Sequence, residues 1–393
     1  HRDLPLLGKF LKPFYYYYDV HCHYNEGAEM FRQLAAVLAD AAEASNATPS
    51  QARMVQARGC ILQASMFVCM SRYKEAQPLI NQNLSVVQVQ NLPWETRIGL
   101  ASLGTIHYAQ GQYADSWSFY EQALPYYQSD GAVNDVITIL IRLGDIATVL
   151  GEYDKARQLL FDNLPILGTV TGKRSKLLFL TTLGDLEYKL GDYGLANQHF
   201  SESRALSVEV NDRTSLAVAL VSLGRTTYGL GNYAESIQLC MDSIAICTET
   251  HNQWGKSFAL AHLGRAYHAS GDRQTALQHY WTALAICQEM GNRWVMSFTL
   301  RQMSRTTLVL GDLNEAQHSA LRAVEIAVDI QAKPLVMDAL MAVAQVMQST
   351  EQKDEALVLA QFVSRESSTE YETRQEALQL CANIQPNMAE GLN

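Results

Sequence analysis

The chain alternates between segments rich in apolar residues and short breaks that contain glycine. From Thr96 to Gln110 the apolar residues fit a helix that is buried on much of its circumference: Ile98, Leu100, Ala101, Leu103, Ile106 and Tyr108. Gly111 follows directly, and glycine closes a helix in a left-handed conformation at little steric cost. Tyr113 begins a second helical pattern, with one apolar face made of Trp117, Tyr120, Ala123 and Leu124. The pattern predicts two antiparallel helices joined by a tight turn.

This helix pair recurs at intervals of forty residues. The turn glycines keep this interval at Gly111, Gly151, Gly191, Gly231, Gly271 and Gly311. A second glycine lies inside five of the first helices, at Gly104, Gly144, Gly184, Gly224 and Gly264. A small residue recurs in the second helices, at Ala76, Ser116, Ala156, Ala196, Ser236, Ala276, Ala316 and Ala356. Three series in phase along most of the chain predict a repeat array.

The internal glycines indicate how the helices pack. Glycine inside a helix costs about 1 kcal/mol relative to alanine, so its recurrence is expected where two helices approach too closely for a side chain. A single pair cannot bury its apolar surface and must stack on its neighbours. The sequence therefore predicts an all-α, right-handed superhelical solenoid of about nine antiparallel helix pairs, whose second helices begin near residues 24, 73, 113, 153, 193, 233, 273, 313 and 353.

We predict one domain over residues 1–384. Residues 1–50 form a divergent first repeat, because the sequence around Tyr24 resembles that around Tyr73. Regular repeats occupy residues 51–368, a helix within 369–384 caps the last repeat, and residues 385–393 are expected to be a flexible tail. Because the chain begins with His1 and not with Met, we expect a longer parent protein.

Composition and charge exclude several classes of protein. Hydrophobic residues make up 48% of the chain and charged residues 18%, which excludes a disordered chain. The net charge of −10 argues against direct binding of nucleic acid or of an anionic membrane, which needs a basic excess. The seven cysteines form no Cys-x-x-Cys pair, and neither a signal peptide nor a long apolar span is present. A cytoplasmic location is expected.

No sequence pattern indicates catalysis or cofactor binding. The stretch Gly168–Ser175 is one residue too short for a phosphate-binding loop, and Arg174 stands where Ser or Thr would hold magnesium. In His21-Cys22-His23, the two histidines would point in different directions from a helix. We therefore expect no enzyme activity, no metal site and no cofactor.

The candidate binding surface is the groove that the first helices should line. The residue after each internal glycine is predicted to face it and changes from acidic to basic along the array: Asp145, Asp185, Arg225 and Arg265, with Arg305 at the matching place. Aromatic side chains follow at Tyr188, Tyr228 and His268. Guanidinium groups suit carboxylates or phosphates, so a ligand with an acidic segment is expected over the C-terminal half. The alternative is a solvated polar face without a ligand.

A run of aromatic residues near the N-terminus indicates a second surface, made of Phe14, Tyr15, Tyr16, Tyr17 and Tyr18. Consecutive residues point all round a helix, so one side should pack on the next repeat while another stays exposed. We predict a docking face for an upstream domain, and full burial of this helix is the alternative. Trp94, Trp254 and Trp294 share one phase of the period and are predicted to pack between repeats.

Units of the form Leu-Gly…Gly-x-Tyr…Ala, with linkers such as Gly291-Asn292-Arg293-Trp294, resemble the tetratricopeptide arrays of STAND-type signalling ATPases, among them MalT-like and AfsR-like bacterial regulators. The ending Glu370–Ala377 is similar to their C-terminal helix, and the aromatic run near the N-terminus is similar to the start of their arrays. The resemblance implies an array that senses an inducer and restrains an upstream nucleotide-binding domain. It carries over neither ATP binding nor DNA binding, because no matching residues are present.

Three functions remain open. The first is a non-catalytic sensor module of a multidomain bacterial signal-transduction protein that regulates transcription. It would bind a peptide, a protein or a small-molecule inducer. The second is a freestanding scaffold or adaptor. The third is a quorum-sensing peptide receptor, which also uses helical repeats. The resemblance and the aromatic run favour the sensor.

Overall fold

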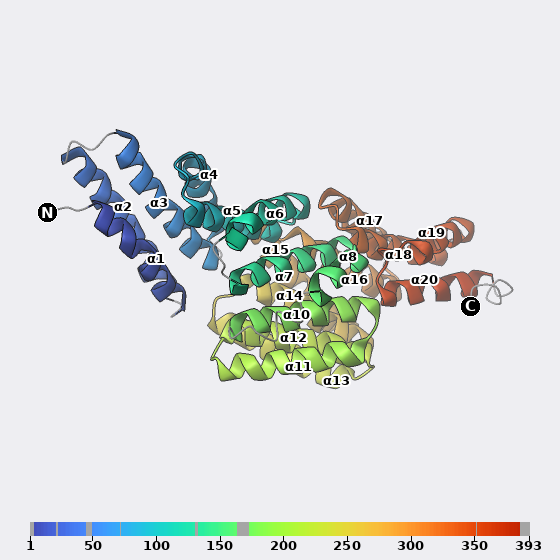
Figure 1. Ribbon diagram of the computed structural model, residues 1–393. Coiled ribbons are helices and arrows are strands. Elements are labelled where there is room, and N and C mark those ends of the chain that lie inside the picture. The colour runs from blue at the N-terminus through green and yellow to red at the C-terminus, as the bar shows by residue number, and fades with distance from the viewer. Residues whose placement is uncertain are drawn as a thin grey trace. The chain divides into compact units, whose positions relative to one another are not determined.

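A computed structural model describes residues 4–20, 23–44, 49–70, 72–129, 133–162, 173–350 and 352–385. These residues form nineteen helices and no strand (Figure 1). Helices that are consecutive in the chain pack against each other, mostly across a tight turn. The predicted all-α solenoid of stacked antiparallel helix pairs is confirmed.

The chain divides into two compact units, residues 1–139 (unit 1) and 140–393 (unit 2). Unit 1 holds α1 (Leu4–Val20), α2 (Tyr24–Ala44), α3 (Pro49–Cys69), α4 (Tyr73–Val89), α5 (Pro93–Ala109), α6 (Tyr113–Ser129) and the start of α7 (Val133–Leu150). Unit 2 continues with α8 (Tyr153–Phe161), α10 (Lys173–Leu190), α11 (Tyr193–Glu209), α12 (Arg213–Gly229), α13 (Tyr233–Glu249), α14 (Gln253–Ser270), α15 (Arg273–Met290), α16 (Arg293–Val309), α17 (Leu313–Asp329), α18 (Lys333–Ser349), α19 (Lys353–Arg365) and α20 (Tyr371–Ile384). The single domain over residues 1–384 stays a prediction, and all of the predicted tail except Gln385 lies outside the described residues.

The turns within the pairs have the predicted geometry. Gly111 has a φ of 77°, and the other five turn glycines also have positive φ. The N–H of Gly111 donates to the carbonyl of Tyr108, and the N–H of Gln112 donates to that of His107, at 3.0 and 2.8 Å. These bonds satisfy carbonyls that the end of a helix leaves without partners. The second helices begin at the predicted residues, Tyr24, Tyr73, Tyr113, Tyr153, Tyr193, Tyr233, Arg273, Leu313 and Lys353.

The internal glycines lie where the two helices of a pair touch. A Cβ added at Gly184 would lie 2.7 Å from a ring carbon of Phe200, closer than side-chain atoms approach. The recurring small residue of the second helix packs against the internal glycine of the first. The hydroxyl of Ser236, for example, donates to the carbonyl of Gly224 at 2.7 Å. The predicted close approach at the internal glycines is confirmed.

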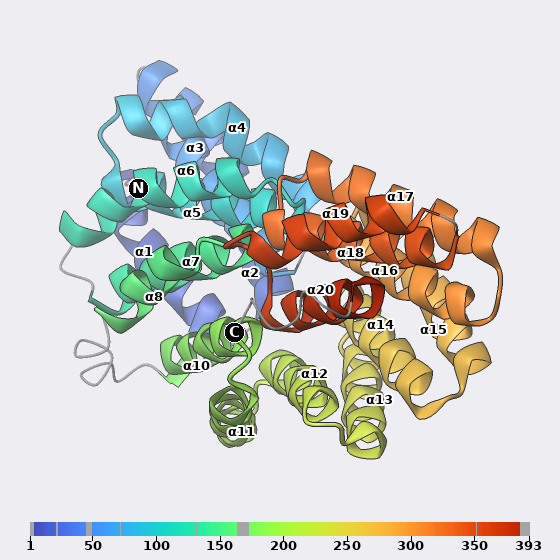
Figure 2. The ribbon, with the colours of Figure 1, turned by 90° about the vertical axis from the view of Figure 1, so that its right-hand side faces the viewer.

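Helix α20 departs from the simple stacking of pairs. Its apolar side, with Ala377, Leu380 and Cys381, packs into a cluster with α18 and α19. Its other side faces into the arc of first helices of unit 2, formed by α10, α12, α14, α16 and α18 (Figure 2). The helix therefore covers the last repeat, as a cap does, and also fills part of the space that an open groove would leave.

Candidate binding surface

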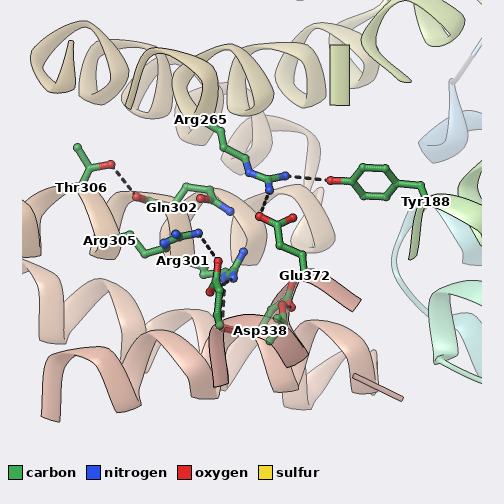
Figure 3. A network of polar contacts seen from close by, with 10 residues as sticks. Tyr188, Arg265, Arg301, Gln302, Arg305, Thr306, Asp338 and Glu372 are labelled. Carbon is green, nitrogen blue, oxygen red and sulfur yellow. Dashed lines mark hydrogen bonds and ion pairs between the residues drawn. The ribbon is translucent and has the colours of Figure 1, made fainter. Parts of the chain in front are cut away.

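Arg265 is the most enclosed of the predicted groove residues. It lies on α14, and only 4% of its side chain is exposed. Its Nη1 donates to the hydroxyl of Tyr188 on α10 at 3.1 Å, and its guanidinium carbon lies 3.9 Å from the ring centre of Tyr228 on α12. Its Nη2 donates to the carboxylate of Glu372 on α20 (Figure 3). Two aromatic residues and one carboxylate thus fix this guanidinium.

Arg301 and Arg305 lie one turn apart on α16 and share a second carboxylate of α20. Nη2 of Arg301 and Nη1 of Arg305 each lie 3.0 Å from a different oxygen of Glu376. Nε of Arg301 also donates to the backbone carbonyl of Asp338 on α18 at 3.2 Å. The side chain of Arg301 is 3% exposed, and that of Arg305 is 22% exposed. We call Arg265, Arg301 and Arg305 the arginine surface.

Further polar contacts hold the start of α20. Lys189 on α10 pairs with Glu370, and its ammonium nitrogen lies 5.9 Å from the ring centre of Trp294 on α16. The hydroxyl of Thr373 donates to the carboxylate of Asp338. The inner side of unit 2 therefore carries alternating cations and carboxylates, and most of the carboxylates belong to the segment around α20.

The environment of these groups changes how they titrate. Burial raises the pKa of Glu372, but the charge and hydrogen bond of Arg265 outweigh burial and hold this pKa well below its usual range. Burial, followed by the charges of Arg225 and Arg265, lowers the pKa of His262 far below its usual value. The ring of His262 is therefore neutral at pH 7, and Glu372 is ionised there.

The predicted acidic residues do not form an open patch. Asp185 pairs with Arg225, whose side chain is 8% exposed and whose guanidinium carbon lies 4.6 Å from the ring centre of Tyr188. Asp145 lies half-buried on α7. His268 forms a hydrogen bond of 2.9 Å with the hydroxyl of Thr306.

The structure corrects one expectation about the groove. The arginines were predicted to line an open binding groove, but Arg225 and Arg265 are almost fully buried because Asp185 and Glu372 pair with them. Six residues of this site were not predicted from the sequence: Lys189, Arg301, Asp338, Glu370, Glu372 and Glu376. The spacing of four residues in Arg301/Arg305 and in Glu372/Glu376 places each pair on one face of its helix, and this was the signal available in the sequence.

The aromatic run near the N-terminus is split between two environments in unit 1. The hydroxyl of Tyr15 lies 3.0 Å from that of Ser65, and its ring meets Trp94 edge-on at 5.6 Å. Phe14 and Tyr17 are 43% and 53% exposed. Full burial of this helix is therefore wrong, since one side packs on the next repeats and the other faces outward. The docking role of Phe14, Tyr15, Tyr16, Tyr17 and Tyr18 stays a prediction.

The remaining candidates are the tryptophans, the possible metal ligands and the phosphate-loop lookalike. Trp254 stacks on Phe258, and Trp294 stacks on Phe298. The rings of Phe258 and Trp294 meet between repeats at 6.0 Å, as predicted.

Among the described residues no three potential ligand side chains are grouped to hold a metal. His21, Cys22 and residues 168–172 of the phosphate-loop lookalike lie outside them. Within the part of the chain described, no helix is long and apolar enough to cross a bilayer.

Comparison with known proteins gives one family match and several similar folds. The tetratricopeptide repeat model matches residues 215–289. A Rap protein complexed with competence and sporulation factor superposes with a TM-score of 0.65 at 15% identity, over 94% of this chain and 99% of that one. NprR in complex with its cognate peptide NprX gives a TM-score of 0.55 at 13% identity, over 70% of this chain and 80% of that one.

A STAND protein with a tetratricopeptide repeat sensor from Pyrococcus horikoshii is also similar. Its TM-score is 0.50 at 13% identity, over 93% of this chain and 54% of that one. No curated protein matches the sequence. Residues 215–289 thus match the tetratricopeptide repeat, and the chain has a helical-repeat fold similar to that of these three proteins.

Proposed function

We propose that the chain is a non-catalytic sensor module of a bacterial signal-transduction protein, and that the inner side of unit 2 binds a peptide or protein segment that carries carboxylates. One observation carries the proposal. Arg265, Arg301 and Arg305 lie together on the first helices, and each of them already holds a carboxylate from a short helix. The surface is therefore complementary to an acidic helical segment.

The chemistry of the surface suits such a ligand. A guanidinium can offer two parallel hydrogen bonds to a carboxylate, and a neighbouring aromatic face keeps it in place. Arg265 has this support from Tyr228. The protein carries a net charge of −10, so an acidic segment is repelled by most of the molecule and can be held only where cationic side chains pair with it.

The similar structures support two candidate functions. The similarity to a STAND protein with a repeat sensor supports a module that acts on an upstream nucleotide-binding domain, in a cytoplasmic regulator of transcription. The fold shared with a Rap protein and with NprR, both solved with a bound factor or peptide, supports a quorum-sensing peptide receptor instead. Both candidates use the same surface, and a freestanding scaffold would use it as well.

A peptide selection tests the proposal. A random 12-residue library displayed on phage is selected against the immobilised chain, and each selected peptide is then measured against two variants. Arg305→Ala removes the most exposed member of the arginine surface, whereas Arg293→Ala removes an arginine of the same helix that pairs with Asp329 on α17. We expect acidic peptides whose binding free energy weakens by about 1.5–3 kcal/mol in Arg305→Ala only. Peptides without acidic enrichment, or equal effects of the two variants, would refute the proposal.

A further inference from the structure

We infer that α20 is a displaceable occupant of the arginine surface, and that the partner that displaces it is an acidic amphipathic helix with carboxylates four residues apart. This inference rests on the proposed function. It adds that the ligand is helical and that α20 controls access to the arginine surface. In the state described here, the chain's own C-terminal helix holds the place of that partner.

The first support is the two-sided chemistry of α20. One side is apolar and packs on α18 and α19. On the other side, Glu372 and Glu376 are one turn apart and meet cations of two different helices, Arg265 on α14 and Arg301 and Arg305 on α16. Residues four apart share a helix face, so any helix with this spacing of carboxylates can present the same pattern to the arginine surface.

The second support is that α20 leaves buried donors unused. Nε of Arg265 and Nε2 of Gln302 have no hydrogen-bond partner among the described residues, and Gln302 lies close to the arginine surface (Figure 3). Buried polar groups in native proteins nearly always have a partner. A ligand with one more suitably placed acceptor would therefore satisfy this surface better than α20 does.

The third support is the energetics of exchange. A buried ion pair contributes little net stability, because the cost of removing both charges from water offsets their attraction. An apolar or basic segment that covered the surface in place of α20 would leave Arg265 and Arg301 buried without a carboxylate, and an unpaired buried charge is costly. A segment that replaces the carboxylates of α20 with its own avoids this cost. The arginine surface therefore resists opening by an apolar or basic segment and permits exchange with an acidic one.

Residues 368–371, which lead into α20, are also tied to the far end of unit 2. The hydroxyl of Tyr153 on α8 donates to the carbonyl of Ser368 at 3.2 Å, across 215 residues of sequence. Lys189 pairs with Glu370, and the ring of Tyr371 lies directly against Gly191. If displacement of α20 also carries away residues 368–371, the contacts between the first and last repeats of unit 2 are lost, and the two ends of unit 2 can then move apart.

A competition experiment in the full chain tests the inference. The probe is a fluorescein-labelled peptide with the sequence of residues 369–385 and the change Cys381→Ser. Its affinity is measured by fluorescence anisotropy for the unchanged chain, for Glu372→Gln/Glu376→Gln, and for Asp354→Asn/Glu355→Gln. The last variant removes the same charge from exposed positions of α19, and it therefore controls for weaker overall repulsion of the acidic probe.

We expect the probe to bind Glu372→Gln/Glu376→Gln about ten-fold tighter or more than the control variant, because a surface occupied for most of the time reduces apparent affinity by its open fraction. Equal affinity for the two variants, with binding lost in Arg305→Ala, would overturn the role of α20 and leave the proposed function standing. Failure of the probe to bind any of these proteins would overturn both.

Hydrogen exchange of the unchanged chain gives a readout that does not depend on the folding of a variant. With saturating probe, backbone amides of residues 371–384 should exchange faster, whereas those of α18 should not. Unaltered exchange of α20 while the probe is bound would show that the two do not compete, and would overturn the inference.

Discussion

Gly184→Leu tests the packing that defines each repeat. The Cβ alone would lie 2.7, 2.9 and 3.0 Å from three carbons of the Phe200 ring. Phe200 is completely buried, so its ring cannot turn out into solvent. An ordinary carbon–carbon contact is about 3.5–4.0 Å, so α10 and α11 must separate by roughly 1 Å before the rest of the leucine is accommodated.

Overpacking of this kind costs about 1–3 kcal/mol, and the better helix propensity of leucine returns up to about 1 kcal/mol of it. We expect the cost to exceed the gain, because the leucine adds further carbons beyond the Cβ at a contact that is already too short. The matched control is Gly194→Leu on α11, where the nearest atom to an added Cβ is Oδ1 of Asp192 at 3.7 Å. That substitution should leave stability unchanged or raise it.

The assay is urea denaturation followed by circular dichroism, with a double variant to show the cause. Phe200→Ala alone should cost about 3–5 kcal/mol. In Gly184→Leu/Phe200→Ala the loss should be smaller than the sum of the two single losses, since the new side chain occupies the space that the ring left. Additive losses, or equal denaturation midpoints for Gly184→Leu and Gly194→Leu, would refute a close contact at Gly184.

Three further predictions concern the turns, the thiols and the pH dependence. Gly231→Ala should cost about 1–2 kcal/mol in urea denaturation, because φ is +82° and only the left-handed backbone opposes an added Cβ; an unchanged midpoint would contradict this. Cys240 is buried, and burial raises its pKa to about 12, so it should react with a thiol reagent only after unfolding, whereas the exposed Cys69 should react in the native chain. Burial and the charge of Arg305 lower the pKa of His268 to about 4, so between about pH 6.5 and 4 the unfolded chain binds a proton that the folded chain refuses. The free energy of unfolding should therefore decrease as the pH falls from about 6.5 to 4. His268→Gln should lose less stability over the same pH range than the unchanged chain.

The repeat architecture could be predicted from the sequence because each recurring residue has one local cause. Gly111 is required by a left-handed turn, and Gly184 by a contact with the helix that follows it in the same repeat. Such causes act over a few residues or over one turn of the chain, so their spacing is visible in a single sequence. The same holds for the aromatic run. Helical geometry alone makes Tyr15 and Tyr17 point to opposite sides of the helix, one packed and one exposed.

The candidate site could be predicted only in part, because its contacts span the array. The position of Arg265 on the inner side follows from its phase in the repeat, but its partner Glu372 lies 107 residues away. Which carboxylate meets which arginine depends on the path of every repeat between them and on the direction in which α20 leaves α19. A solenoid with one more or one fewer repeat would bring α20 to other arginines, and no local pattern records that.

The contacts of α20 also bear on how unit 2 can respond to a ligand. In an ordinary solenoid each repeat contacts only its neighbours, so a change at one repeat decays along the array. Here Ser368 and Glu370 join the last repeats to α8 and α10, and the arginine surface lies between these two ends. A partner that supplied carboxylates to Arg265 and Arg305 without touching Tyr153 or Lys189 would keep the arginines paired while it released that tie. A ligand shifts an equilibrium only through interactions that differ between the two states. The two occupied states would then differ in the contacts of Tyr153 and Lys189, whereas the arginine surface would be paired in both.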